Sequence, residues 1–165
     1  MNLREVQKPL KERYRADPAT SRITLVAHGV PGDAPIACSV DIGRAIYEAQ
    51  AHPGVGGTGT AACSGDLLLG ALAACAQLTC QMVAAAMEIS VENVEVTVEG
   101  DLDLSGTLGV AREARVGFES IRLRFDIQAP TASEEQLAAL CEKTERYCVV
   151  LQTLVDPPRV ATGVG

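Results

Sequence analysis

Aromatic residues are scarce in this sequence, and tryptophan is absent: aromatic positions make up 3% of the 165 residues. A hydrophobic core must therefore be built mainly from Leu, Val, Ile and Ala, within a hydrophobic fraction of 47%. Charged residues make up 21%, which excludes a highly charged disordered chain and indicates a globular protein. The length suits one compact domain. We expect residues 1–165 to form this single domain, with residues 1–20 as an N-terminal arm.

The sequence also lacks an excess of positive charge, because 21 acids outnumber 14 Lys and Arg and the formal net charge is −7. A chain without a basic stripe gains little from counterion release by phosphates, so we expect no nucleic-acid partner. The first residues, MNLREVQKPLKERYRADP, contain no apolar segment of a secretory signal. We therefore expect a cytoplasmic protein whose six cysteines are reduced thiols.

Residues 65–87 lack Lys and Arg altogether and contain a single acid, Asp66, near the start. A helix of this length would extend about 33 Å, enough to cross a bilayer. Its polar residues, its high alanine content and the absence of flanking cations argue against a membrane span. A helix that is apolar on nearly all sides must instead be buried in protein. We expect a central helix that is covered by a sheet or by a second subunit.

The glycine-rich stretch 52–60 has the G-x-G-x-x-G spacing at Gly54, Gly56 and Gly59 but lacks the context of a dinucleotide site. Such a site needs a preceding strand, a helix directly after the glycines and an acid about 20 residues further on. An alanine-rich run stands where that acid should be. We therefore predict a flexible loop here and no cofactor.

Metal-ligand spacing is absent as well. His28 and His52 are isolated, and no C-x-x-C or H-x-x-x-H pair occurs, so we expect no metal site. A buried cysteine usually behaves as a small apolar residue, and we interpret Cys38, Cys80 and Cys141 in this way. The other three cysteines are Cys63 in a predicted loop and Cys75 and Cys148 in predicted helices.

The expected elements form an α+β domain in which helices back an antiparallel sheet. A β-hairpin is predicted from residues 21–29 and 34–42, which flank a Pro-Gly turn. Ser64 is the candidate N-cap of the long helix, with Asp66 in its first turn. The remaining elements are two alternating strands and a second helix, over residues 91–104, 118–129 and 133–154.

Two stretches resemble the signatures of one protein family. GGTGTAACSGDLLLGALAACAQLT resembles the central-helix signature of the OsmC/Ohr family, the osmotically inducible and organic hydroperoxide resistance proteins, and EKTERYCVVLQTL resembles its second cysteine signature. The resemblance covers about residues 21–155. It implies an OsmC-like fold, in which antiparallel sheets wrap around the long central helices of an intertwined homodimer. It also implies a thiol peroxidase that reduces organic hydroperoxides, with a dithiol such as a lipoyl group as reductant.

The resemblance gives each helical cysteine a role, with Cys75 at the peroxidatic position and Cys148 at the resolving position. The peroxidatic thiolate attacks the peroxide, and the second thiol captures the sulfenic acid as a disulfide before over-oxidation. In the family, an Arg from the early β region supports the thiolate and is held by a Glu near the start of the central helix. Residues 45–111 contain no Lys or Arg, so the candidates for this cation are Arg15 and, after it, Arg22.

The sequence departs from the family pattern beside both cysteines. Where well-known members have the Glu, this chain has Gly65, and Asp66 follows it, so Asp66 becomes the candidate for holding the Arg. The Pro that is common just after the second cysteine is replaced by Val149. The shorter, shifted acid leaves a second interpretation open, in which the domain senses redox state or binds a small ligand with little peroxidase turnover.

Overall fold

The computed structural model describes residues 3–24, 27–31, 37–42 and 45–164, and the expected α+β class is confirmed. The N-terminal elements are α1 (Leu3–Ala16), the 3-10 turn η1 (Pro18–Ser21) and strands β1 (His28–Pro31), β2 (Ala37–Asp41) and β3 (Ile46–Gln50). The remaining elements are η2 (Pro53–Val55), α2 (Ser64–Met87), β4 (Asn93–Leu102), α3 (Leu104–Thr107), β5 (Phe118–Gln128), α4 (Glu134–Tyr147) and α5 (Val149–Val155).

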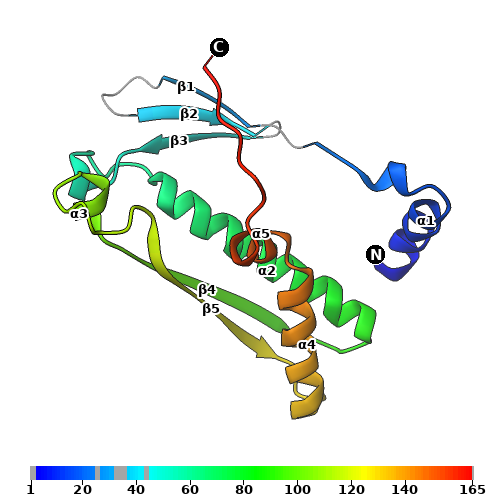
Figure 1. Cartoon of the computed structure of the whole chain (residues 1–165). Helices are drawn as coiled ribbons and strands as arrows, with labels where there is room; N and C mark the ends of the chain where they lie inside the picture. The colour runs from blue at the N-terminus through cyan, green and yellow to red at the C-terminus, as the bar shows by residue number, and fades with distance from the viewer. Residues whose placement is uncertain (1–2, 25–26, 32–36, 43–44, 165) are drawn as a thin grey trace.

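Helix α2 is the central element, and it lies along the antiparallel pair β4–β5 while α4 and α5 also pack against it (Figure 1). Its buried residues repeat at helical spacing, as expected for a helix with one side in the core. They are Leu72, Ala76, Thr79, Cys80, Val83 and Ala84. Two apolar clusters share this side of α2, one around Cys80 and Leu140 and the other around Leu72 and Cys148. Cys80 and Cys148 are therefore part of the core, and Cys75 packs against it.

The start of α2 differs by one residue from the expectation, because Cys63 rather than Ser64 is its N-cap. The carboxylate of Asp66 accepts a hydrogen bond of 2.9 Å from the backbone N–H of Cys63. Asp66 thus occupies the third helical position, where an acid satisfies a free N–H and complements the helix dipole. By length and composition α2 is apolar enough to cross a membrane, and 33% of its most apolar window is buried within the chain.

Strands β4 and β5 pair from Asn93 opposite Gln128 to Leu102 opposite Phe118, with an irregularity between Asp101 and Leu102. Side chains alternate between the two faces of a strand, so one face of this pair is apolar and meets α2. The residues of that face include Val94, Val96, Val98, Ile121, Leu123, Phe125 and Ile127. The opposite face is polar and exposed.

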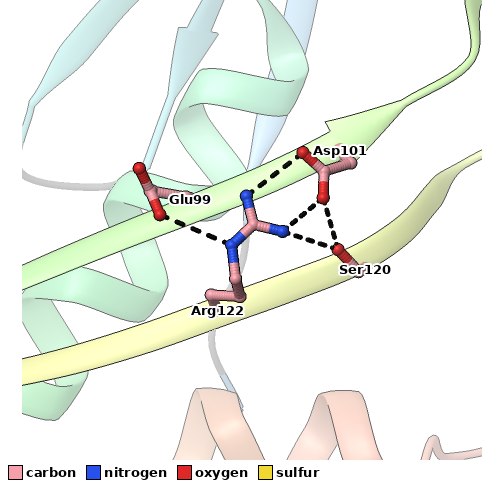
Figure 2. A network of polar contacts seen from close by, with 4 residues as sticks. All are labelled: Glu99, Asp101, Ser120 and Arg122. Carbon is pink, nitrogen blue, oxygen red and sulfur yellow. Dashed lines mark hydrogen bonds and ion pairs between the residues drawn. The ribbon is translucent and has the colours of Figure 1, made fainter.

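Arg122 is the centre of a polar network on this exposed face (Figure 2). Its guanidinium donates to both carboxylate oxygens of Asp101, one of them at 3.1 Å, and its Nε lies 3.4 Å from a Glu99 oxygen. The hydroxyl of Ser120 donates to Asp101 at 2.6 Å. The hydrogen bonds from Arg122 foremost, and then from Ser120, lower the pKa of Asp101 to about 2. The network links two residues of β4 to two residues of β5.

The second cysteine-bearing helix is two helices rather than the single one expected over residues 133–154. Helix α4 ends at Tyr147, and Cys148 has extended backbone angles (φ −73°, ψ 107°) before α5 begins at Val149. The prediction of one continuous helix was therefore wrong. The break frees the first N–H groups of α5, since the first turn of a helix has no partners for them within the helix.

The N-terminal sheet has three antiparallel strands in the order β1–β2–β3. The expected hairpin is confirmed in β1 and β2, but its first strand begins at His28 rather than at residue 21, because η1 occupies Pro18–Ser21. The turn between these strands, residues 32–36, lies outside the described residues. Strand β3 was not expected, and it extends the hairpin by a third strand.

Within the N-terminal arm, α1 is a regular helix of 14 residues that packs against α2. It carries five Lys or Arg and two acids, in a chain whose formal net charge is −7. This helix, which lies outside the two sheets, thus carries five of the 14 Lys and Arg of the chain.

Candidate active site

Cys75 lies in the middle of α2, on the side that faces α5, and it is partly exposed. Its sulfur is 4.0 Å from the hydroxyl oxygen of Thr79, one helical turn further along. Residues four apart on a helix are neighbours on its surface, so this contact follows directly from the sequence spacing. Thr79 was not among the predicted site residues, although this spacing could have identified it.

Cys148 lies opposite, at the break between α4 and α5, and it is fully buried. Its backbone N–H donates to the carbonyl of Thr144 at 2.9 Å, and its own carbonyl accepts from Gln152 at 2.9 Å. It therefore closes one helix and opens the next. Cys75 and Cys148 belong to the same apolar cluster, and each thiol shifts the pKa of the other. The structure thus brings together the two cysteines that the sequence predicted as a pair.

The pKa values of the two thiols are shifted in opposite directions. Burial raises the pKa of Cys75, but hydrogen bonds outweigh it, so that the net shift is downward. The donors are the N–H of Val150, the Cys148 thiol, the hydroxyl of Thr79 and the N–H of Val149. The pKa of Cys148 is raised, first by burial and then by the interaction with Cys75. Cys75 is therefore the better thiolate of the pair, as its predicted role requires.

A second pair of thiols lies further along the same two helices. Cys80 on α2 is fully buried, and its pKa is raised, first by burial and also by the charge of Cys141, while a hydrogen bond with Thr144 opposes the rise. The pKa of Cys141 on α4 is raised too, by burial and then by the nearby charge of Glu145. Cys80 thus has the buried surroundings that the sequence predicted for it, whereas Cys141 is only partly buried and lies near a carboxylate.

Asp66 lies at the N-terminal end of α2, nine residues before Cys75, which corresponds to about 13 Å along the helix axis. The hydrogen bonds with Cys63, first from its backbone N–H and then from its side chain, lower the pKa of Asp66. The carboxylate is thus ionised and is already engaged in capping α2.

Arg15 lies in the last turn of α1 and is exposed. It follows Gln7 and Lys11 at intervals of four residues, so the three side chains share one side of α1. Arg22 follows η1 and is exposed as well. Among the described groups that shift the pKa of Cys75 there is neither an Arg nor a Lys. The role of Arg15, or of Arg22, in supporting the Cys75 thiolate thus stays a prediction.

An apolar cavity of about 420 Å³ lies between α2, β5 and α5 beside the thiol pair. Leu72 of its wall is three residues before Cys75, and Leu151 is three residues after Cys148. Arg115 and Glu119 stand at its charged side. This cavity can hold the apolar part of a small molecule, although neither cysteine lines it.

Within the part of the chain that the structure describes, no group of three or more His, Cys, Asp and Glu side chains could hold a metal ion. His52 accepts a hydrogen bond of 3.0 Å from the N–H of Gly54 and caps η2. Gly56 ends that turn with a φ of 95°, a conformation that glycine adopts without strain. Cys63 is a free, partly buried thiol at the start of α2, whereas the side chain of Cys38 lies outside the described structure.

The sequence was compared with models of protein families, and the model described as OsmC-like protein matches residues 57–163. This segment begins in the glycine-rich loop and contains both cysteine-bearing helix regions. No curated protein is similar enough to count as a match.

Several solved structures share the fold. An OsmC-like protein from Mycoplasma pneumoniae has a TM-score of 0.69 at 21% identity, over 82% of this chain and 89% of that one. A protein from Legionella pneumophila titled organic hydroperoxide resistance protein OsmC has a TM-score of 0.60 at 20% identity, with 81% and 90% covered. The organic hydroperoxide resistance protein OhrB of Bacillus subtilis has a TM-score of 0.52 at 18% identity, with 82% and 93% covered. At these identities the likeness concerns the fold.

Proposed function

Because the chain belongs to the OsmC-like protein family, we propose that it is a thiol peroxidase that reduces organic hydroperoxides to alcohols. The observation that carries this proposal is the contact between a thiol of lowered pKa, Cys75, and a thiol of raised pKa, Cys148. A thiolate is the attacking form of cysteine, and a protonated partner nearby is preserved for the second step. The names of the Legionella and Bacillus proteins support the same activity.

The proposed reaction proceeds in three balanced steps. The Cys75 thiolate attacks the distal oxygen of the hydroperoxide, the O–O bond breaks, and the alkoxide takes up a proton and leaves as the alcohol. The Cys148 thiol then gives up its proton and its sulfur attacks the sulfur of the Cys75 sulfenic acid, so that a disulfide forms and the departing hydroxide takes up the proton and leaves as water. An external dithiol, for example a lipoyl group, reduces the disulfide by two exchange steps and becomes a disulfide itself. The reaction needs no bound cofactor.

Val149 and Val150 prepare Cys75 for the first step through their backbone N–H groups. Two hydrogen bonds from the start of a helix stabilise a negative charge on sulfur in place of a side-chain cation. Arg15 is proposed as an additional cation in the complete enzyme, with Asp66 as its partner. Arg15→Ala should slow the first step by raising the Cys75 pKa, and an equal effect of Arg22→Ala instead would transfer this role to Arg22.

A second candidate function is redox sensing or small-ligand binding with little turnover. The observation that favours it is the hydrogen bond of Asp66 with the N–H of Cys63, because an acid engaged in capping is less available to hold an arginine. Slow disulfide formation without sustained peroxide consumption would support this alternative.

A homodimer is also proposed. Leu78 of α2 is 59% exposed and Met82 is 41% exposed, although both lie on the most apolar helix of the chain. An apolar cavity of about 600 Å³ lies between the start of α2 and β3, and Tyr47 and Leu67 are among the residues that line it. A second subunit that packs its own α2 against α2 of the first would cover these exposed apolar residues. Monomers rarely leave so large an apolar surface open to water. A stable folded 17.3 kDa monomer in sedimentation experiments at micromolar concentration would refute the dimer.

The decisive experiment is a coupled assay of cumene hydroperoxide consumption, with dihydrolipoamide or dithiothreitol as the reductant. Sustained turnover, together with a Cys75–Cys148 disulfide in peptide maps after one equivalent of peroxide, would support the peroxidase. Cys38, Cys63, Cys80 and Cys141 should stay reduced under these mild conditions. A main bridge between Cys63 and Cys75 would overturn the role of Cys148. The proposed chemistry needs thiols that are kept reduced, and for that reason we propose a cytoplasmic location.

A further inference from the structure

Gln152, in the first turn of α5, connects the two helices on either side of the break at Cys148. Its backbone N–H donates to the carbonyl of Cys148 at 2.9 Å, as part of the first turn of α5. The amide nitrogen of its side chain donates to the carbonyl of Glu145 at 2.9 Å, seven residues earlier and in the last turn of α4. Gln152 therefore fastens α5 to the end of α4, at the point where the two helices take different directions (Figure 1).

The carbonyl of Glu145 would have a different partner if α4 continued through Cys148. In an uninterrupted α-helix each N–H donates to the carbonyl four residues earlier, so the N–H of Val149 would bond to Glu145. At the break, the N–H groups of Val149 and Val150 are instead donors to the sulfur of Cys75. The side-chain amide of Gln152 thus takes the place at Glu145 that the N–H of Val149 would have in a continuous helix.

This exchange of donors matters because the two demands on Val149 compete. The last carbonyls of a helix have no partner within the helix and readily accept any N–H that comes within reach. Without the Gln152 amide, the Glu145 carbonyl can take up the N–H of Val149, and α4 then extends into the first residues of α5. An N–H that serves the helix is lost to the sulfur. A side-chain donor at Glu145 therefore keeps the backbone donors available to Cys75.

We propose that Gln152 is a positioning residue, whose side-chain amide holds the break between α4 and α5 so that the N–H groups of Val149 and Val150 are directed at Cys75. It acts through these backbone groups and does not touch the reacting atoms. The inference rests on the proposed peroxidase for its part in turnover, but its effect on the Cys75 thiol exists without peroxide. Gln152 is exposed, so its replacement should leave the apolar core intact.

The test compares the wild type with Gln152→Met, which keeps the length of the side chain and removes the amide. Weaker donation to the sulfur raises the pKa of Cys75, so the pH profile of its alkylation by iodoacetamide should move to higher pH. At neutral pH the rate should fall about threefold, the effect of weakening one exposed hydrogen bond. At high pH, where the thiolate is fully formed, the rate should not fall below that of the wild type. Site-resolved mass spectrometry on the reduced protein measures both profiles.

Thr153→Val is the matched control. The hydroxyl of Thr153 is exposed and donates to the carbonyl of Val149 at 2.8 Å, a bond that lies within α5 and does not cross the break. The alkylation profile of this variant should coincide with that of the wild type. An unchanged Cys75 profile in Gln152→Met, or an equal shift in Thr153→Val, would overturn the proposal. Faster alkylation of both Cys75 and Cys148 at every pH would also overturn it, because it would indicate a loosened segment rather than lost donors.

The reaction with peroxide separates this inference from the proposed function. In stopped-flow measurements with cumene hydroperoxide at neutral pH, the first step in Gln152→Met should be slower by the same factor of about three. If the wild type itself does not react, the proposed peroxidase has failed. The alkylation profiles then still decide the role of Gln152, because they require neither peroxide nor turnover.

Discussion

The two thiol pairs of this protein lie on the same helices, yet their chemistry differs. In both cases a cysteine of α2 is close to a cysteine of the α4–α5 segment, with a threonine beside it. The pKa of Cys75 is lowered, whereas the pKa values of Cys80 and Cys141 are both raised. The extent of burial alone cannot explain the opposite pKa shifts of Cys75 and Cys141, since both residues are only partly buried.

The difference comes from the backbone near each pair. At Cys148 the helix breaks, and the N–H groups of Val149 and Val150 donate to Cys75. Cys80 and Cys141 lie beside an uninterrupted part of α4, where the N–H groups are used within the helix and the carboxylate of Glu145 is close. Thiol reactivity in this core is thus determined by the position of a helix break rather than by the number of nearby cysteines.

The largest expected effect comes from replacing the α2 cysteine of each thiol pair in turn. Cys75→Ser should abolish peroxide turnover and the sulfenic acid signal together, because serine is not a nucleophile toward peroxide here. Cys80→Ala should retain most of the turnover. A coupled assay measures the peroxide turnover of both variants, and mass spectrometry detects the sulfenic acid. Circular dichroism checks that both variants fold. Equal loss in the two variants would remove the distinction between the pairs.

The next largest effect concerns the two partners on the other helix. Cys148→Ser should allow one round of peroxide attack and then accumulate sulfenic and later sulfinic acid on Cys75, since no resolving thiol remains. Cys141→Ala should turn over peroxide as the wild type does. Peptide mass spectrometry after one equivalent of cumene hydroperoxide distinguishes the products. Over-oxidation of Cys148 in Cys75→Ser at the wild-type rate would reverse the two roles.

The pH dependence of alkylation should separate the pairs in the unmodified protein. The thiolate is the reactive form, so a lowered pKa moves the rise in rate to lower pH and a raised pKa moves it to higher pH. Iodoacetamide should therefore modify Cys75 at a lower pH than Cys80, Cys141 or Cys148. Site-resolved mass spectrometry across a pH series on the reduced protein measures the order, and coincident profiles would contradict it.

A smaller effect is expected from the threonines. Thr79→Val removes a hydroxyl that lowers the Cys75 pKa, and a lost hydrogen bond of about 1 kcal/mol corresponds to roughly a fivefold slower attack at neutral pH. Thr144→Val is the matched change at the other pair and should leave peroxide attack unchanged, although it removes a 2.7 Å bond to the carbonyl of Leu140. Stopped-flow measurement of the first step tests both variants.

The smallest effect concerns Glu145. Its charge helps to raise the Cys141 pKa, so Glu145→Gln should lower that pKa and slightly accelerate alkylation of Cys141. Because Glu145 is exposed, its effect is screened, and the difference between variant and wild type should vanish at 1 M salt. A difference that persists at high salt would indicate a structural change instead.

Most of the central fold could be predicted from patterns of polarity. The apolar run of α2 and the alternation in β4 and β5 identify these elements because each has one buried face with a clear period. Strand β3, IYEAQ, was missed because one of its five residues is charged and its burial shows no strict alternation. The first expected strand was too long, since Pro18 favours the start of a turn.

The two cysteines of the candidate site were predicted, whereas Thr79 and the backbone donors were not, and Arg15 and Asp66 stay predictions. Cys75 and Cys148 were identified through the resemblance of two motifs, and the structure brings them together. The break at Cys148 could not be predicted, because Val149 is neither proline nor glycine and tertiary packing rather than local propensity determines the conformation there. The backbone donors of Val149 and Val150, which lower the Cys75 pKa, could therefore not be predicted from the sequence.

The Arg122 network has a consequence for how the chain selects its strand pairing during folding. A slip of β5 by one residue would turn Arg122 away from Asp101 and Glu99 and would turn the apolar face of the pair toward water. Glu99 lies directly opposite Arg122, and Asp101 lies two residues further along the same face of β4. The charge pairs on the outer face and the apolar residues on the inner face therefore favour the same register of β4 and β5.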